Sequence, residues 1–480
     1  MVFSSVIFLF LFLPLVLSVY YLVRKKYRNF TLLAFSLLFY FWGEGKYVVI
    51  LCAYMVCNYF FGLAIERAKS KETAVGDKKA KLALAVALAF NLSLLVFFKY
   101  FNFLVDNFNG IFAFSGVSLS VKKIHLPIGI SFFSFQAMSY VIDIYRRDVK
   151  AQKNLINFSM YKALFPQLIA GPIVRYRDVA SQVDERSESL DKFLRGLRRF
   201  ILGLGKKVLI ANTVATVADG AFGAKLSECS TGLAWLGVVC YALQIYFDFS
   251  GYSDMAIGLG KMFGFDFLEN FNFPYISRSI REFWRRWHMS LSFWFRDYLY
   301  IPLGGSRAGA SRLYLNQLVV FFLCGLWHGA SWTFIAWGLW HGAFLVLERT
   351  RFGKLLDRVP RPLQHAYAVL VVLIGWVLFR ADTLPLAIAY LKAMFFLSSG
   401  TIPAVEYLNT KIVLAILAGL IGCTPIAAGL VARAKESVVG QAFARRGLAL
   451  ASSLFLVAVF LGSIILVSTN TYNPFIYFRF

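Results

Sequence analysis

The chain has 480 residues, of which 59% are hydrophobic and only 16% are charged. A soluble domain carries about a quarter of its residues as charged side chains, so this composition excludes an ordinary soluble globule. The formal net charge of +25 would suggest nucleic acid as the partner of a soluble protein, but no basic region stands apart from the apolar segments, and we exclude that class too.

Long apolar segments set the fold class. A membrane-spanning helix needs about 20 apolar residues, and six segments reach or approach this length: 1–23, 47–65, 82–98, 233–259, 412–431 and 448–467. A further segment lies at 366–379. None alternates like a membrane strand. We predict an all-α polytopic membrane protein that crosses the bilayer roughly ten to twelve times, with no separate soluble domain.

Basic clusters give the expected orientation. Residues 24–28 carry four Lys or Arg directly after the first apolar segment, and further clusters lie at 67–81 and 146–150. Lys and Arg concentrate in cytoplasmic loops, where they also meet anionic lipid. We therefore expect a periplasmic N-terminus. The first segment lacks a basic start and a cleavage motif, so we expect it to be kept as a span.

Two segments do not resemble ordinary spans. Residues 165–174 contain two prolines and a Gly-Pro step, which predicts a broken, re-entrant piece buried in protein. Residues 274–305 repeat apolar side chains at steps of three and four, with arginines opposite. This pattern predicts an amphipathic helix lying in the cytoplasmic interface.

Residues 313–347 contain no charged residue other than histidine and lie between two basic flanks. Both flanks should be cytoplasmic, so this stretch should form a hairpin whose turn falls near 329–332. The sequence GLWHGA occurs twice here, at 325–330 and 338–343. His328 would then lie deep in the bilayer or towards its outer face, where an ionisable group is a candidate for function. The alternative is that it only satisfies buried carbonyl groups.

Two further polar groups are candidates. Gln244, Asp248 and Asp254 lie within an apolar segment, where they either clamp neighbouring helices or orient a catalytic histidine. The arginines of the interfacial segment either anchor it to lipid or hold the phosphates of coenzyme A; they are Arg278, Arg281, Arg285 and Arg296. The six cysteines are scattered without a CxxC, which indicates neither a metal site nor a disulfide framework.

Several motifs together carry a family resemblance. WHMSLSFWFRDYLYIPLGG at 287–305 and LWHG at 326–329 closely resemble the membrane-bound O-acyltransferase family. DFSGYSDMAIG at 248–258 and GPIVR at 171–175 resemble its bacterial branch. The ending NPFIYFRF at 473–480 is similar to the members that serve alginate O-acetylation.

The resemblance implies a ring of tilted helices around a tunnel, with re-entrant and interfacial helices. It also implies that His328 is the essential membrane histidine, with Trp327 beside it, and that His288 is a second histidine on the inward side. The chain would be one domain, 1–480: N-terminal spans 1–126, a motif-bearing core 127–347 and C-terminal spans 348–480.

The expected function is transfer of an acetyl group, from cytoplasmic acetyl-CoA as the donor, across the bacterial inner membrane. The acceptor would be an exopolysaccharide, most of all alginate, reached directly or through periplasmic acetyltransferase partner proteins. The alternatives are transfer of D-alanyl or another acyl group to an envelope polymer, and a non-catalytic carrier or export scaffold. A secondary transporter would show broken helices in matching repeats, and the two GLWHGA copies are too short for that.

Overall fold

The computed structural model describes residues 2–169, 171–225, 227–307, 309–396, 398, 400–437, 442–469, 472–473 and 476. Most of the C-terminal motif at 473–480 therefore lies outside the described residues. The chain forms two compact units, Met1–Gly196 with Ala256–Leu268, and Leu197–Met255 with Glu269–Phe480. The unit boundaries do not coincide with the sequence divisions after residues 126 and 347.

The described part of the chain is helical, as predicted, apart from an isolated bridge between Cys229 and Ile402. The helices of the first unit are η1 (Phe8–Phe12), α1 (Leu13–Leu22), η2 (Lys25–Tyr27), α2 (Arg28–Glu44), η3 (Gly45–Tyr47), α3 (Val48–Lys69), α4 (Ala74–Phe112), η4 (Ala113–Ser115), α5 (Ile130–Arg146), α6 (Leu155–Ala163), α7 (Phe165–Leu168) and α8 (Tyr176–Asp184).

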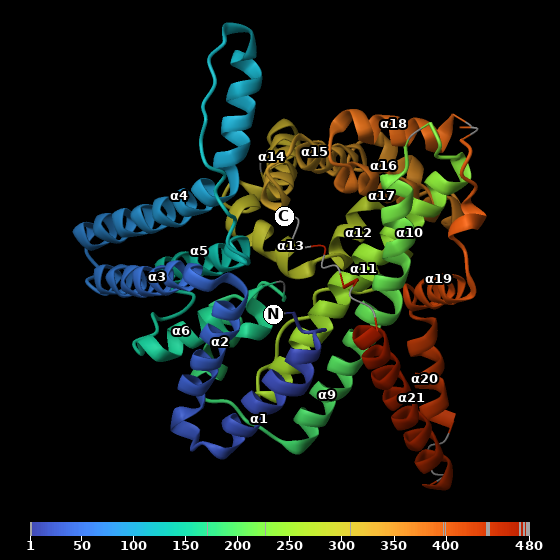
Figure 1. Cartoon of the computed structure of the whole chain (residues 1–480). Helices are drawn as coiled ribbons and strands as arrows, with labels where there is room; N and C mark the ends of the chain where they lie inside the picture. The colour runs from blue at the N-terminus through green and yellow to red at the C-terminus, as the bar shows by residue number, and fades with distance from the viewer. Residues whose placement is uncertain are drawn as a thin grey trace. The chain divides into compact units, whose positions relative to one another are not determined.

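Helices α3 and α4 lie side by side in this unit (Figure 1), and two buried side-chain amides join them. Asn58 Nδ2 lies 3.2 Å from Asn91 Oδ1, and Asn91 Nδ2 lies 2.9 Å from Asn58 Oδ1. Each side chain satisfies the polar atoms of the other, which buried amides require.

The Pro- and Gly-rich segment 165–174 forms only the four-residue helix α7, followed by a non-helical stretch. Its described side chains are buried, including Phe165 at 0% exposure and Ile173 at 2%. The prediction of a broken segment buried in protein is therefore confirmed for the residues described.

The second unit carries the helices of the candidate site. Both α9 and α11 cross the unit boundary. Its helices are α9 (Leu190–Gly205), η5 (Lys206–Ala211), α10 (Asn212–Gly223), α11 (Thr231–Met262), η6 (Pro274–Ile276), α12 (Ile280–Arg286), α13 (Met289–Phe295), η7 (Arg296–Tyr300), η8 (Gly305–Arg307), α14 (Ala310–His328), α15 (Trp332–Leu347), α16 (Arg351–Leu356), α17 (Arg361–Arg380), α18 (Leu384–Phe395), η9 (Ala404–Tyr407), α19 (Thr410–Gly422), α20 (Ile426–Ser437) and α21 (Ala442–Thr469).

Within the described residues, six helices are long and apolar enough to cross a membrane, or seven if one bent pair is a single span. This is fewer than the predicted ten to twelve. Part of the difference is that Phe8–Leu22, Trp332–Leu347 and Leu384–Phe395 are apolar but short. The count is also lower because α2 and α3 are counted together as one candidate span, Lys25–Lys69.

The expected span at 412–431 is the bent pair. The helix stops at Gly422 and resumes at Ile426 after a bend of 70°. Pro425 explains the break, because its ring clashes with the preceding helical turn. The expected spans at 233–259, 366–379 and 448–467 lie within α11, α17 and α21, each a candidate span.

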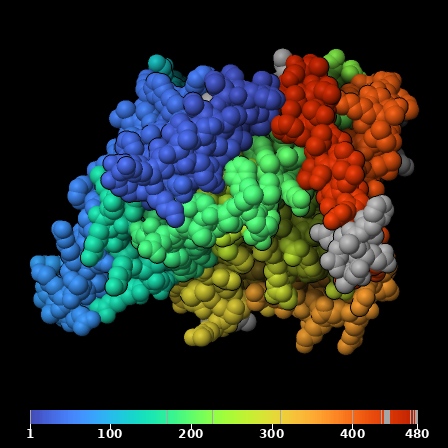
Figure 2. All heavy atoms as spheres, turned by 90° about the horizontal axis from the view of Figure 1, so that it is seen from below, coloured from blue at the N-terminus to red at the C-terminus, as the bar shows by residue number. Residues whose placement is uncertain are grey.

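Helix α21 presents an apolar surface. Figure 2 shows it (red) on the outside of the second unit. Leu450, Leu454, Phe455, Leu461 and Ile465 are each between 53% and 61% exposed. Side chains of this kind suit hydrocarbon rather than water, in accord with a lipid-facing span.

Candidate functional site

His328 is the last residue of α14, at the tip of a helical hairpin. Gly329 then takes an extended conformation, with φ −166° and ψ 152°. Ser331 is the N-cap of the next helix, α15, and its hydroxyl accepts a hydrogen bond from Thr333 N at 3.3 Å. The predicted turn near 329–332 is therefore confirmed.

The repeated GLWHGA sequence has a packing explanation. Its first glycines, Gly325 and Gly338, meet where α14 and α15 lie side by side (Figure 1). A methyl group on Gly338 would overlap the carbonyl oxygen of Phe321, and one on Gly325 would overlap that of Phe334. Only glycine permits this approach.

Aromatic rings surround His328, which is 3% exposed. Its ring centroid lies 4.9 Å from that of Trp327, 4.9 Å from that of Trp337 and 5.3 Å from that of Phe379. These rings shield the imidazole from water. A substrate would reach it only by displacing or passing between them.

His288 is fully buried at the junction of α12 and α13, with left-handed angles of φ 45° and ψ 54°. Its Nδ1 lies 3.1 Å from Asn270 Oδ1. The Asn270 amide is oriented by its other bonds, since Oδ1 accepts from Ser290 Oγ at 2.9 Å and Nδ2 donates to Ser253 Oγ at 3.0 Å. Nδ1 of His288 must therefore carry the proton, which leaves Nε2 as the basic nitrogen.

Burial lowers the pKa of His288 to about 3. Removing an imidazolium from water costs free energy, so burial favours the neutral ring. His288 is therefore uncharged at neutral pH and can accept a hydrogen bond.

The left-handed conformation of His288 corrects one prediction. The continuous amphipathic helix expected over 274–305 is wrong, because the chain breaks at 287–288 and forms η6, α12, α13 and η7 instead. The predicted apolar face is nevertheless buried, as Phe283, Trp287 and Leu291 show. The break turns His288 inward and fully buries it.

The ring of Trp327 lies close to both histidines. Its ring centroid is 6.0 Å from that of His288 and 4.9 Å from that of His328. The structure therefore brings together three of the residues singled out from the sequence. His341, in the second GLWHGA copy, is instead buried beside Trp284 and Trp337, 5.3 Å from each.

The four candidate arginines are all exposed, and their described contacts differ. Arg296 pairs with its neighbour Asp297 at 2.7 Å, and Arg278 Nε lies 4.0 Å from Glu282. Arg281 differs from the others, because it lines a groove of about 410 Å³ together with Arg349 and Lys354.

Glu348 fixes one wall of this groove. Its carboxylate accepts the backbone N–H groups of Ile280 at 2.6 Å and Arg281 at 3.0 Å, at the start of α12. Arg281 in turn donates to the Glu348 carbonyl at 3.0 Å. Burial raises the pKa of Glu348 despite these bonds.

The polar residues of α11 take part in ion pairs. Asp248 lies 2.6 Å from Lys207 Nζ, and both are buried. Asp254 pairs with Lys206 at 2.6 Å and with Arg199 at 2.7 Å. Gln244 is buried, and within the described residues its Oε1 has no hydrogen-bond partner. The two aspartates thus hold α11 to α9 and η5, and neither is bonded to a histidine in a described contact.

Sequence reasoning missed Asn270, Glu348 and Lys207. Asn270 stands in a loop with no periodic pattern, and its partners lie 18 and 20 residues ahead. Lys207 alone carried a signal, since a lysine that borders an apolar stretch of a membrane protein needs an acidic partner.

Comparison with known proteins adds independent findings. Residues 38–355 match the model of the MBOAT, membrane-bound O-acyltransferase family. The chain is 44% identical to "Probable alginate O-acetylase AlgI" of Azotobacter vinelandii, over 100% of both chains. It is 48% identical to the protein of the same name from Pseudomonas aeruginosa, over 84% of this chain and 76% of the relative. It is also 35% identical to "Peptidoglycan O-acetyltransferase" of Helicobacter pylori, over 85% and 83%.

Proposed function

Because the chain belongs to the membrane-bound O-acyltransferase family, we propose that it takes an acetyl group from cytoplasmic acetyl-CoA and passes it across the inner membrane for O-acetylation of alginate. The observation that supports this most directly is the position of His328 at the tip of α14, with Trp327 in contact with both His328 and His288. The choice of alginate rests on relatives whose printed name states that polymer.

His328 is the general base in this proposal. A ring nitrogen accepts the proton of an acceptor hydroxyl while the hydroxyl oxygen bonds to the acetyl carbonyl carbon. The carbon–sulfur bond of the donor breaks, and the thiolate of coenzyme A leaves with the electron pair. A neutral imidazole suits this step at neutral pH. The acceptor hydroxyl belongs to the polymer or to a serine of a periplasmic partner protein.

His288 serves the donor side. Its neutral ring, fixed by Asn270, offers Nε2 as an acceptor towards the donor thioester region. The ring of Trp327 contacts both imidazoles, and in this proposal each imidazole serves its own side of the transfer. A tunnel joining the two sides would open along these aromatic rings.

The groove beside Arg281 is the proposed seat of the donor's phosphates. Guanidinium and ammonium groups bind phosphate strongly, and Arg281, Arg349 and Lys354 supply three of them. The groove lies next to the basic flank after α15, which the positive-inside rule assigns to the cytoplasm.

Alginate analysis tests the function directly. Alginate from cells that lack this chain should carry no O-acetyl groups by mass spectrometry, and restoring the chain should restore them. Alginate with unchanged acetylation would contradict the proposal and direct attention to another envelope polymer.

A non-catalytic carrier is the second reading, because a buried histidine is also found in transporters. Vesicles containing the purified chain, radiolabelled acetyl-CoA outside and the acceptor inside separate the two. Label on the acceptor supports the enzyme. Label that accumulates inside without transfer would support the carrier instead.

A further inference from the structure

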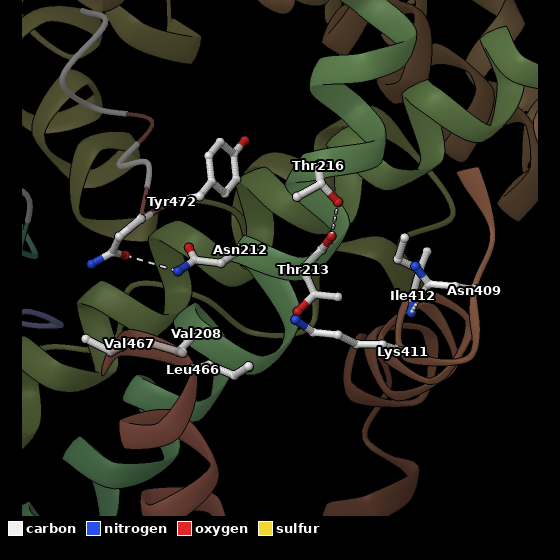
Figure 3. A pocket seen from close by; sticks show the side chains of 11 residues that line it. Val208, Asn212, Thr213, Thr216, Asn409, Lys411, Ile412, Leu466, Val467 and Tyr472 are labelled. Atoms are coloured by element: carbon white, nitrogen blue, oxygen red, sulfur yellow. Dashed lines mark hydrogen bonds between the residues drawn. The ribbon is translucent and has the colours of Figure 1, made fainter. Parts of the chain in front are cut away.

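A small polar pocket lies in the second unit, and neither His288 nor His328 lines it. Its volume is about 110 Å³, and it is lined by η5, α10, the start of α19, the end of α21 and residues 472–473 (Figure 3). Its polar side chains are Asn212, Thr213, Thr216, Asn409, Lys411, Tyr472 and Asn473. Amides and hydroxyls of this kind recognise hydroxylated ligands through hydrogen bonds.

Lys411 gives the pocket a positive charge. Its side chain extends from α19 towards Thr213 on α10 (Figure 3). In the part of the chain that the structure describes, no carboxylate lies within ion-pair distance of its ammonium group. The other charged groups nearby occur as pairs, Lys207 with Asp248 and Arg380 with Asp219. The pocket therefore carries one uncompensated positive charge and favours an anion.

The interior side of the pocket is held in place. Asn212 Oδ1 accepts a hydrogen bond from Lys207 Nζ at 3.0 Å, and Asn212 Nδ2 donates to Asn473 Oδ1 at 3.1 Å. Asp248 accepts the backbone N–H of Ile476 at 2.9 Å. Asn473 is thereby bonded to α10 and Ile476 to α11, and the pocket is built before a ligand arrives.

A chain of contacts connects the pocket to His328. Phe379 packs against His328. The next residue, Arg380, donates to Asp219 at 2.7 Å, and the Tyr472 hydroxyl donates to the other oxygen of the same carboxylate. Tyr472 lines the pocket. A ligand seated there lies at one end of this series of contacts, and the proposed base lies at the other end.

Three candidate spans end on this side: Leu190–Gly223, Arg361–Arg380 and Arg446–Thr469. Each begins in or directly after a cluster of Lys and Arg, which the positive-inside rule places in the cytoplasm. Their ends, near Asp219, Arg380 and Val467, then face the periplasm. This is the side from which an exported polymer arrives.

We propose that the pocket binds one uronic acid unit of the acceptor polymer, with its carboxylate on Lys411 and its hydroxyls on Thr213 and Asn409. This inference rests on the proposed function. A volume of about 110 Å³ is well below the roughly 300–1,000 Å³ of pockets that enclose a drug-sized ligand. It suits the carboxylate and one edge of a sugar ring, with the rest of the polymer outside.

Binding of a short mannuronate oligosaccharide to the purified chain in lipid nanodiscs, without acetyl-CoA, tests the proposal. Lys411→Gln should weaken binding about tenfold or more, because a charge-assisted hydrogen bond is lost, and Lys411→Arg should retain it. Lys392→Gln, an exposed lysine on α18, is the matched control and should bind like the wild type. A neutral oligosaccharide of the same length should bind more weakly.

Equal binding by Lys411→Gln and the wild type would overturn the proposal. Competition by inorganic phosphate at matched concentration would also overturn it, because it would show a general anion site. So would a Lys411→Gln variant that still binds the oligosaccharide and loses only its binding to an acidic partner protein. Acetyl transfer is measured separately on the same samples. If transfer is normal and oligosaccharide binding does not depend on Lys411, the pocket is not the acceptor site and the proposed function stands. If binding depends on Lys411 and no acetyl group is transferred, the pocket binds the oligosaccharide and the proposed function is wrong.

Discussion

The side chain of Asn270 holds His288 in one orientation, with Oδ1 of the amide 3.1 Å from Nδ1 of the imidazole. The same oxygen accepts from the Ser290 hydroxyl, and the amide nitrogen donates to Ser253 on α11. One loop residue thus determines the tautomer of a buried histidine and ties it to a long helix.

Asn270→Ala should therefore lower the turnover rate, by up to about 100-fold, because a displaced ring misplaces the reacting groups. Asn270→Asp keeps the shape but adds a negative charge, which favours the imidazolium form of His288. Its rate should become pH-dependent in a range where the wild type is flat. Initial rates of acetyl transfer against pH measure both effects. Wild-type kinetics in Asn270→Ala would show that His288 needs no orientation.

The low pKa of His288 predicts a specific loss of stability in acid. A folded pKa of about 3 lies below the ordinary value of about 6.5, so the unfolded chain binds the proton more readily. Burial of the neutral ring therefore contributes its full stabilisation of the folded state above pH 6.5, and this contribution is lost as the pH falls towards 3. At pH 5 the loss reaches about 2 kcal/mol.

Thermal unfolding in detergent at pH 7.5 and pH 5.0 measures this loss. His288→Gln cannot bind the proton, so its unfolding temperature should fall less between the two pH values than that of the wild type. Equal falls would mean that the ring is charged, or solvated, in the folded protein.

The contact between Gly325 and Gly338 predicts that the hairpin tolerates no added methyl group. Gly338→Ala would overlap the Phe321 carbonyl and push α14 from α15. We expect a destabilisation of about 1–3 kcal/mol and a loss of transfer, because His328 ends α14. Gly429→Ala on α20 is the control, since a methyl group there meets nothing within 4 Å. An unfolding temperature for Gly338→Ala equal to that of the control would disprove the close contact.

The groove beside α12 predicts a donor-specific defect. Arg281→Ala and Lys354→Ala should each raise the KM for acetyl-CoA about tenfold, through loss of a charged contact to phosphate. Arg358→Gln, exposed on the same basic flank but outside the groove lining, should not. The KM for the acceptor should stay unchanged in all three. If Arg358→Gln raised the KM for acetyl-CoA equally, the effect would come from general surface charge.

Local patterns predicted the parts of the fold that depend on local chemistry. Two basic flanks around an uncharged stretch were enough to place the break after His328, and prolines were enough to predict a broken segment at 165–174. The break at His288 could not be predicted, because neither glycine nor proline marks it and the apolar steps continue across it. Asn270 was missed since a contact between distant residues leaves no periodic trace. The role of each site residue stays a prediction.

We propose that the imidazole of His328 removes a proton during acyl transfer. Reconstituted chain with radiolabelled acetyl-CoA and acceptor, normalised to monodisperse protein, measures it. His328→Ala should transfer acetyl groups about 10²–10⁴-fold more slowly than the wild type, while His341→Gln, in the matching copy of the motif, should keep the wild-type rate. Transfer by His328→Ala at the wild-type rate would show that His328 is not the general base.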